Sequence, residues 1–199
     1  MTINMPVEPA ANELLSTDPL ALLIGMLLDQ QVPLERAFSA PYDLTRRLGH
    51  RPTAGELAVH DPEALAALFA ERPALHRYPT SMAARVQALA QLIVARYDGD
   101  AARVWGEAAD GPDLRKRVAE LPGFGAQKAQ IFVALLAKQL GVQPPGWREA
   151  AGPFGQDGSY CSVADIRDED SLARVRAYKQ ELKAAAKAKT QGGPPTQAN

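Results

Sequence analysis

The chain has 199 residues, of which 46% are hydrophobic and 23% charged, a composition typical of a folded globular domain and not of a disordered chain. The formal net charge of −1 excludes a protein-wide basic field, so any site for a polyanion must be a local patch. The single cysteine, Cys161, excludes an intramolecular disulfide and a cysteine-built zinc or iron–sulfur centre.

Ala, Leu, Arg, Glu and Gln dominate the sequence, and no stretch sustains the alternation of a strand, so we expect an all-α fold. We expect a flexible lead-in over residues 1–17, one helical domain over 18–189 and a disordered tail over 190–199. No secretory signal is visible at the start, and no apolar run approaches the roughly 20 residues needed to cross a bilayer. We therefore expect a cytoplasmic protein that associates with no membrane.

Capping residues, prolines and apolar periodicity predict the helices. Asp18 and Pro19 begin the first, which is apolar on nearly every side and therefore expected to be buried. Thr80 or Ser81 is expected to cap the longest. In chain order the predicted helices span 20–31, 34–49 with a break near Pro41, 52–59, 63–70, 80–97, 110–120 and 126–140.

Residues 141–162 break the helical pattern, with five Gly and three Pro. Irregular segments of this length are uncommon inside compact domains and are often functional. The alternative is a loop that packs on the core through Trp147, Phe154 and Tyr160, and the sequence does not decide between the two.

The last helix follows an acidic cluster, which suits the positive end of a helix dipole. Basic side chains follow along it, and we interpret them as a solvated face, with a DNA-touching face as the alternative. They are Arg174, Arg176, Lys179, Lys183, Lys187 and Lys189.

The most informative segment is Leu121-Pro122-Gly123-Phe124-Gly125, which has a predicted helix on each side, together spanning about 114–140. Two glycines let another backbone approach closely, and the first amides of the following helix are unpaired, which together suit a phosphate oxygen. Residues 113–128 carry four cations (Arg115, Lys116, Arg117 and Lys128) against two carboxylates. A plain glycine turn between two helices is the alternative.

This segment resembles the helix-hairpin-helix of the HhH-GPD superfamily of base-excision DNA glycosylases. A second stretch, residues 22–32 (LLIGMLLDQQV), is similar to that family's early buried helix, which ends in a glutamine-containing segment at the DNA surface. The resemblance covers roughly 19–140 and is to a small, divergent actinobacterial-type branch. It implies a two-lobed helical glycosylase fold, here with a long irregular loop after the hairpin.

The chain departs from the family at two positions that carry chemistry. Where bifunctional members have a nucleophilic Lys in the hairpin, this sequence has Gln127, and Lys128 points to another side of the helix. We therefore expect no Schiff-base lyase activity. Where the family has its catalytic Asp, this sequence has Pro145. The acid must be displaced, supplied from elsewhere, or absent.

Four carboxylates are candidates for the missing acid, each with a structural alternative. Asp29 directly precedes the two glutamines and ranks first, with helix-end hydrogen bonding as its alternative. Glu149 is near the departure in sequence and ranks second, with a surface charge as its alternative. Asp157 and Asp165 rank lower, with turn formation as the alternative for Asp157 and helix capping as the alternative for Asp165.

Expected DNA contacts follow from the same resemblance. Gln30 and Gln31 are candidates for the wedge that fills the gap left by an extruded nucleotide, or else cap the end of their helix. Trp147 and Tyr160 are candidates for stacking on the flipped base, or else pack in the core. The hairpin contacts expected on the DNA backbone are Leu121, Pro122, Gly123, Phe124, Gly125, Gln127 and Lys128.

The sequence therefore predicts a base-excision DNA repair protein, a glycosylase that flips a damaged or mismatched base and hydrolyses its N-glycosidic bond. A catalytically inactive DNA-binding protein is the main alternative, and a helical interaction protein with a purely structural hairpin is a weaker one. We expect double-stranded DNA as partner, nucleoid association when DNA is bound, no metal or redox cofactor, and no obligate protein partner.

Overall fold

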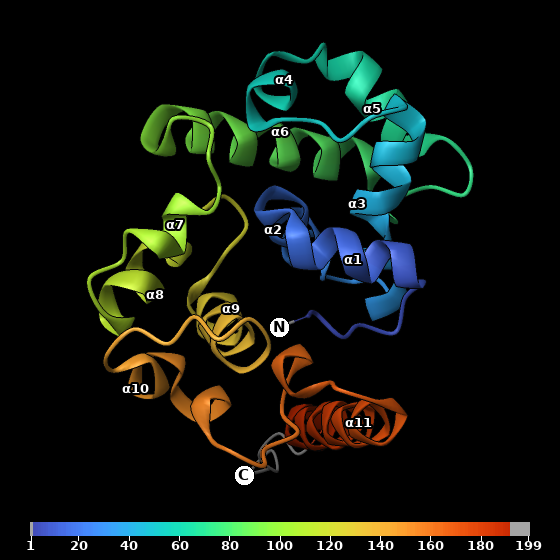
Figure 1. The fold of residues 1–199 in the computed structure, drawn as a ribbon. Helices are drawn as coiled ribbons and strands as arrows, with labels where there is room; N and C mark the ends of the chain where they lie inside the picture. The colour runs from blue at the N-terminus through green and yellow to red at the C-terminus, as the bar shows by residue number, and fades with distance from the viewer. Residues whose placement is uncertain (1, 192–199) are drawn as a thin grey trace, which may run out of the picture.

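The computed structural model describes residues 2–191, and side-chain positions through residue 185. Over these residues the chain is helical with no strand, which confirms the all-α prediction. The helices form two groups (Figure 1). One contains α3 to α6, the other contains α7 to α11, and α1 and α2 lie between them. No single helix in the described part is long and apolar enough to cross a membrane, and α1 and α2 pass that test only as a pair bent by 114°.

The start of the chain is ordered and packed, which corrects the expected flexible lead-in. Ile3 and Met5 are buried, and helix α1 spans Pro9–Thr17. The Ile3 amide donates to Ser16 Oγ (2.9 Å), and the Asn4 amide donates to Gln139 Oε1 (2.8 Å). Two buried apolar side chains and these hydrogen bonds fix a segment in which the sequence shows no regular pattern.

Helix α2 (Pro19–Leu28) is the buried centre of the molecule. Asp18 caps it, with Oδ1 accepting from the amides of Leu20 and Ala21 at 3.0 and 3.1 Å, as predicted. Nine of its ten residues are buried. Gly25 lets α3 approach closely, since a Cβ there would lie 3.0 Å from the ring of Phe38. The helix ends three residues earlier than predicted, at the point where the candidate site begins.

The first group of helices is built on α6. Helix α3 (Leu34–Leu48) continues through Pro41, so the predicted break is wrong: burial of its apolar face outweighs the one backbone donor that proline lacks. Helices α4 (Ala54–Val59) and α5 (Pro62–Ala70) pack on α6 (Pro79–Tyr97). Thr80 and Ser81 lie inside α6 and do not cap it, because Pro79 already occupies its first turn.

The second group is built on the hairpin helices. A short α7 (Arg103–Gly106) leads into α8 (Gly111–Ala119), and α9 (Ala126–Gln139) packs against α8. The segment expected to be irregular contains α10 (Trp147–Ala151) and the 3-10 turn η1 (Gly152–Gly155), both against α9. Helix α10 also packs on α8, and Gly111 permits this close approach, because a Cβ there would lie 2.4 Å from the carbonyl oxygen of Gly146.

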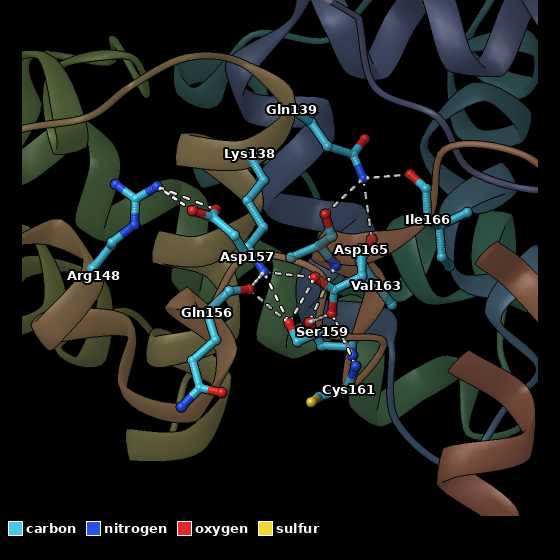
Figure 2. Close-up of polar contacts among 12 residues, drawn as sticks. Lys138, Gln139, Arg148, Gln156, Asp157, Ser159, Cys161, Val163, Asp165 and Ile166 are labelled. Atoms are coloured by element: carbon cyan, nitrogen blue, oxygen red, sulfur yellow. Dashed lines mark hydrogen bonds and ion pairs between the residues drawn. The ribbon is translucent and has the colours of Figure 1, made fainter. Parts of the chain in front are cut away.

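A buried ion pair ties the end of α9 to the last part of the chain (Figure 2). Lys138 Nζ lies 2.6 Å from Asp165 Oδ1, and both side chains are less than a tenth exposed. Asp165 belongs to the 3-10 turn η2 (Val163–Asp165), where it completes a capping box with Ser162. The final helix α11 spans Glu169–Gln191, so residues 190 and 191 of the expected tail are helical and the rest lie outside the described residues.

Candidate nucleic-acid interface and active site

The hairpin between α8 and α9 presents backbone to solvent and apolar side chains to the core. The Phe124 amide donates to the Leu121 carbonyl (3.0 Å), and Gly123 has a φ of +83°, which favours glycine. Leu121 and Phe124 are 2% and 3% exposed, so of these two predicted contacts only the backbone is available to DNA. Pro122 is half-buried, whereas Gly123 and Gly125 are exposed.

The first turn of α9 is open for an anion. Gly125 precedes the helix without a side-chain cap, and a methyl group at Gly125 would meet no atom within 4 Å. The amides of this turn therefore keep unpaired donors at the positive end of the helix. Of the four predicted cations, Arg115 and Lys116 are exposed nearby, whereas Arg117 is paired with Asp113 at 2.9 Å. The expected patch is thus smaller than the sequence indicates.

Asp29 and Gln127 line one pocket of about 350 Å³, which brings together the end of α2 and the start of α9. Its polar lining also includes Cys161, Ser162 and Lys179. Its apolar wall consists of Ile131, Pro153, Phe154, Val163, Tyr178 and Leu182. A mostly apolar cavity with a few converging polar groups is the usual form of a ligand site.

Burial has the largest influence on the pKa of the Asp29 carboxyl. Loss of solvent raises the pKa of its carboxyl, while the positive charges of Lys179 and Lys128 act in the opposite direction and lower it. A carboxylate that is poorly solvated but flanked by cations interacts strongly with any positive charge that develops in the pocket. Asp29 is also the C-cap residue of α2, so the end of the buried helix fixes its backbone.

Lys128, predicted as a DNA contact, is half-buried and directs its amine toward the end of α2. Its Nζ donates to the carbonyls of Met26 (2.8 Å) and Leu27 (3.1 Å), in the last turn of α2. Desolvation lowers the pKa of this amine, and Asp29 raises it. Lys128 therefore caps the helix that ends in Asp29.

Comparison with protein families matches a part of the chain that includes both the end of α2 and the hairpin. The model of the HhH-GPD superfamily base excision DNA repair proteins matches residues 24–195. The chain belongs to this superfamily. As a member of the HhH-GPD superfamily it is a base excision DNA repair protein that acts on DNA. No curated protein and no solved structure matches the chain.

The two glutamines of this HhH-GPD protein differ in how they are held. Gln30 Nε2 donates to the Leu27 carbonyl (2.7 Å), the helix-capping alternative, and its Oε1 accepts from Arg85 (3.0 Å). Its carbonyl is bonded to the ring of the buried His76 (2.8 Å). Gln31 is exposed and has a φ of +57°, uncommon for a residue other than glycine. Of the two glutamines, therefore, only Gln31 is exposed and has a side chain that makes no hydrogen bond to another described residue.

Three other predicted site residues lie away from the pocket. Glu149 is exposed on α10, does not line the Asp29 pocket, and fits its surface-charge alternative. Trp147 is 6% exposed and packs in the core, so its ring is not available for stacking. Tyr160 lines a different pocket, with the Arg174 guanidinium 4.8 Å from its ring centre.

The lower-ranked acids are also accounted for. Asp165 is buried in its ion pair with Lys138, and Asp157 is an exposed partner of Arg148 at 2.8 Å. Within the described residues, no three His, Cys, Asp or Glu side chains gather as a metal site. The sequence missed the pocket residues Cys161, Ser162, Tyr178 and Lys179, which no local motif marks. For Tyr178 and Lys179 the only signal was the basic character of the last helix, and Cys161 and Ser162 had none.

Proposed function

We propose that this HhH-GPD protein is a monofunctional DNA N-glycosylase in which Asp29 is the catalytic carboxylate. The observation that carries the proposal is that Asp29 and Gln127 line one pocket at the base of the hairpin. Gln127 occupies the position at which bifunctional relatives carry an amine, so the pocket has a carboxylate but no hairpin nucleophile. Hydrolysis by water is the chemistry that this arrangement supports.

DNA binding is assigned to the hairpin. The amides of Gly125 and the first turn of α9 hold a backbone phosphate of the duplex, with Arg115 and Lys116 adding charge nearby. Contacts of this kind position the duplex without reading its sequence. Gln31 fills the space left in the base stack, since Gln30 is already bonded to Arg85 and Leu27.

The extruded nucleotide enters the Asp29 pocket, whose apolar wall accommodates a base. As the bond from C1′ to the base lengthens, positive charge develops on the sugar, and the Asp29 carboxylate stabilises it. The same carboxylate accepts a proton from the water that adds to C1′, and the base leaves. A raised pKa suits a general base, because it moves the group toward the pH at which it works.

The test compares Asp29→Asn with Glu149→Gln, a matched control on an exposed acid outside the pocket. Duplexes that carry uracil, hypoxanthine, alkylated purines or oxidised bases are incubated with each protein and heated in alkali to reveal base release. We expect Asp29→Asn to lose about 10²–10⁴-fold in rate. Glu149→Gln should match the wild type.

Two results would overturn the proposal. Equal rates for Asp29→Asn and the wild type would place the acid elsewhere. Tight, salt-sensitive duplex binding without base release from any lesion would identify the protein as an inactive DNA-damage-binding protein, the alternative that the substitution of Pro145 for the family acid favours.

A further inference from the structure

Two lysines influence Asp29, and they differ in what else they bind. Lys128 of α9 is committed to the carbonyls of Met26 and Leu27. Lys179 of α11 lines the pocket together with Asp29, and within the described residues its amine has no hydrogen-bond or ion-pair partner. Lys179 is therefore the cation whose charge is available to the pocket.

The final helix is fixed in a way that keeps Lys179 at this place. Asp168 Oδ1 accepts from the Ser171 amide (2.8 Å) at the start of α11, and Val175 is 1% exposed in the core. Tyr178 and Lys179, one turn further, and Leu182, two turns further, all line the pocket. Positions 175, 178, 179 and 182 share one face of a helix: Val175 is buried in the core, whereas Tyr178 and Leu182 border the pocket at the surface.

A second tether lies next to this face. Arg176 forms an exposed ion pair with Glu35 near the start of α3. Helix α3 follows the segment that contains Asp29 and the two glutamines, so α11 contacts the chain both at η2 and just beyond that segment. These two contacts hold the C-terminal helix beside the pocket.

We propose that Lys179 is a positioning residue that holds the Asp29 carboxylate charged beside the reacting sugar, so that α11 completes the active site. This inference rests on the proposed function of Asp29. The residue acts through Asp29 and forms no bond to the substrate. Coulomb attraction between a cation and a half-buried carboxylate is strong because little solvent screens it.

The charges around Asp29 define the expected effect. Lys128 of α9 and Lys179 of α11 act on its charge, and Arg85 of α6 acts on Lys128. Tyr178 of α11 and Cys161 of the preceding loop line the same pocket. Burial raises the pKa of Asp29, and Lys179 lowers it. Removing Lys179 therefore lets Asp29 retain its proton to higher pH, which leaves less of the charged form at acidic pH.

The experiment measures single-turnover base release against pH for the wild type, Lys179→Met, Lys179→Arg and Lys183→Met. Lys183 lies one turn further along α11, is exposed and does not line the pocket. Lys179→Met should move the acidic limb of the profile to higher pH, with activity recovered under alkaline conditions. Lys179→Arg should restore the wild-type profile, and Lys183→Met should leave it unchanged.

A second readout separates this inference from the proposed function. The side-chain carboxyl of Asp29 is titrated by ¹³C NMR, with Asp29→Asn used to assign its signal. A higher midpoint in Lys179→Met supports the pairing even if the wild type releases no base, a result that would refute only the glycosylase proposal. An unchanged midpoint, or an equal change in Lys183→Met, would overturn the inference. So would borohydride trapping of Lys179 on abasic DNA, which would make it a nucleophile.

Discussion

Replacing Lys138 with methionine is expected to destabilise the protein strongly, because it leaves the buried Asp165 carboxylate without its cation. The pair is 2.6 Å long, with side chains 7% and 3% exposed. Lys138 Nζ also donates to the Gln156 carbonyl (2.8 Å) and to Ser159 Oγ (3.1 Å). Asp165 Oδ2 accepts from the amide of Cys161 at 3.0 Å. The network therefore fixes the segment that supplies one wall of the pocket (Figure 2).

Removing one partner of a buried ion pair costs about 3–5 kcal/mol. For a domain of this size, 1 kcal/mol corresponds to roughly 2–4 °C in Tm, so Lys138→Met should lower the Tm by about 6–20 °C. The double variant Lys138→Met/Asp165→Asn leaves no charge unpaired. Its loss should fall short of the sum of the two single losses by about 0.5–3 kcal/mol.

The measurement is urea and thermal unfolding followed by far-ultraviolet circular dichroism. Asp157→Asn is the matched control, because Asp157 forms an exposed ion pair with Arg148 in the same segment, and its loss should cost under about 1 kcal/mol. The reasoning is refuted if Lys138→Met costs no more than this control. Additive effects in the double variant would equally show that the two charges do not interact.

Three further predictions concern the hairpin, the packing of α8 and the pocket. Gly125→Ala should leave the Tm unchanged, since the added methyl meets no atom within 4 Å and the φ of −77° suits alanine. It should weaken duplex binding in a gel-shift titration, because the methyl group occupies the space that a phosphate needs at the start of α9. Gly111→Ala places a methyl 2.4 Å from the Gly146 carbonyl oxygen and should cost at least about 1–3 kcal/mol in urea unfolding; a neutral result would contradict the close packing of α8 and α10. Because burial raises the pKa of Asp29, its charge opposes folding above that pKa. Asp29→Asn should therefore raise the Tm at neutral pH, with the gain disappearing as the pH falls and the native carboxyl takes up its proton; a lower Tm at neutral pH would contradict this sign.

The sequence predicted helices wherever local chemistry determines their ends. The Asp18-Pro19 and Asp61-Pro62 pairs each begin a helix by side-chain capping and a preset proline φ. Helix α10 has no such signal, because Gly146 precedes it and the packing of Trp147 on the neighbouring helices supports it. The continuity of α3 was missed for a related reason: the tertiary burial of Pro41 outweighs its local effect.

The site was predictable only in the part that is continuous in sequence. Asp29 was found because it adjoins the two glutamines, and the hairpin because its glycines are spaced for a tight turn. Lys179 and Cys161 lie far along the chain, and only the tertiary placement of α11 and of the loop before it brings them to the pocket that Asp29 lines. Lys128 was assigned to DNA from its charge, but its long side chain reaches the carbonyls at the end of α2.

The amide of Gln139 joins the two ends of the domain. Its oxygen accepts from the Asn4 backbone, and its nitrogen donates to the carbonyls of Val163 (3.1 Å) and Ile166 (3.0 Å). Truncating or tagging the first residues would thus disturb η2, the turn from which α11 departs toward the pocket. An altered activity in such a variant would reflect this mechanical linkage, even though the modified residues lie outside the Asp29 pocket.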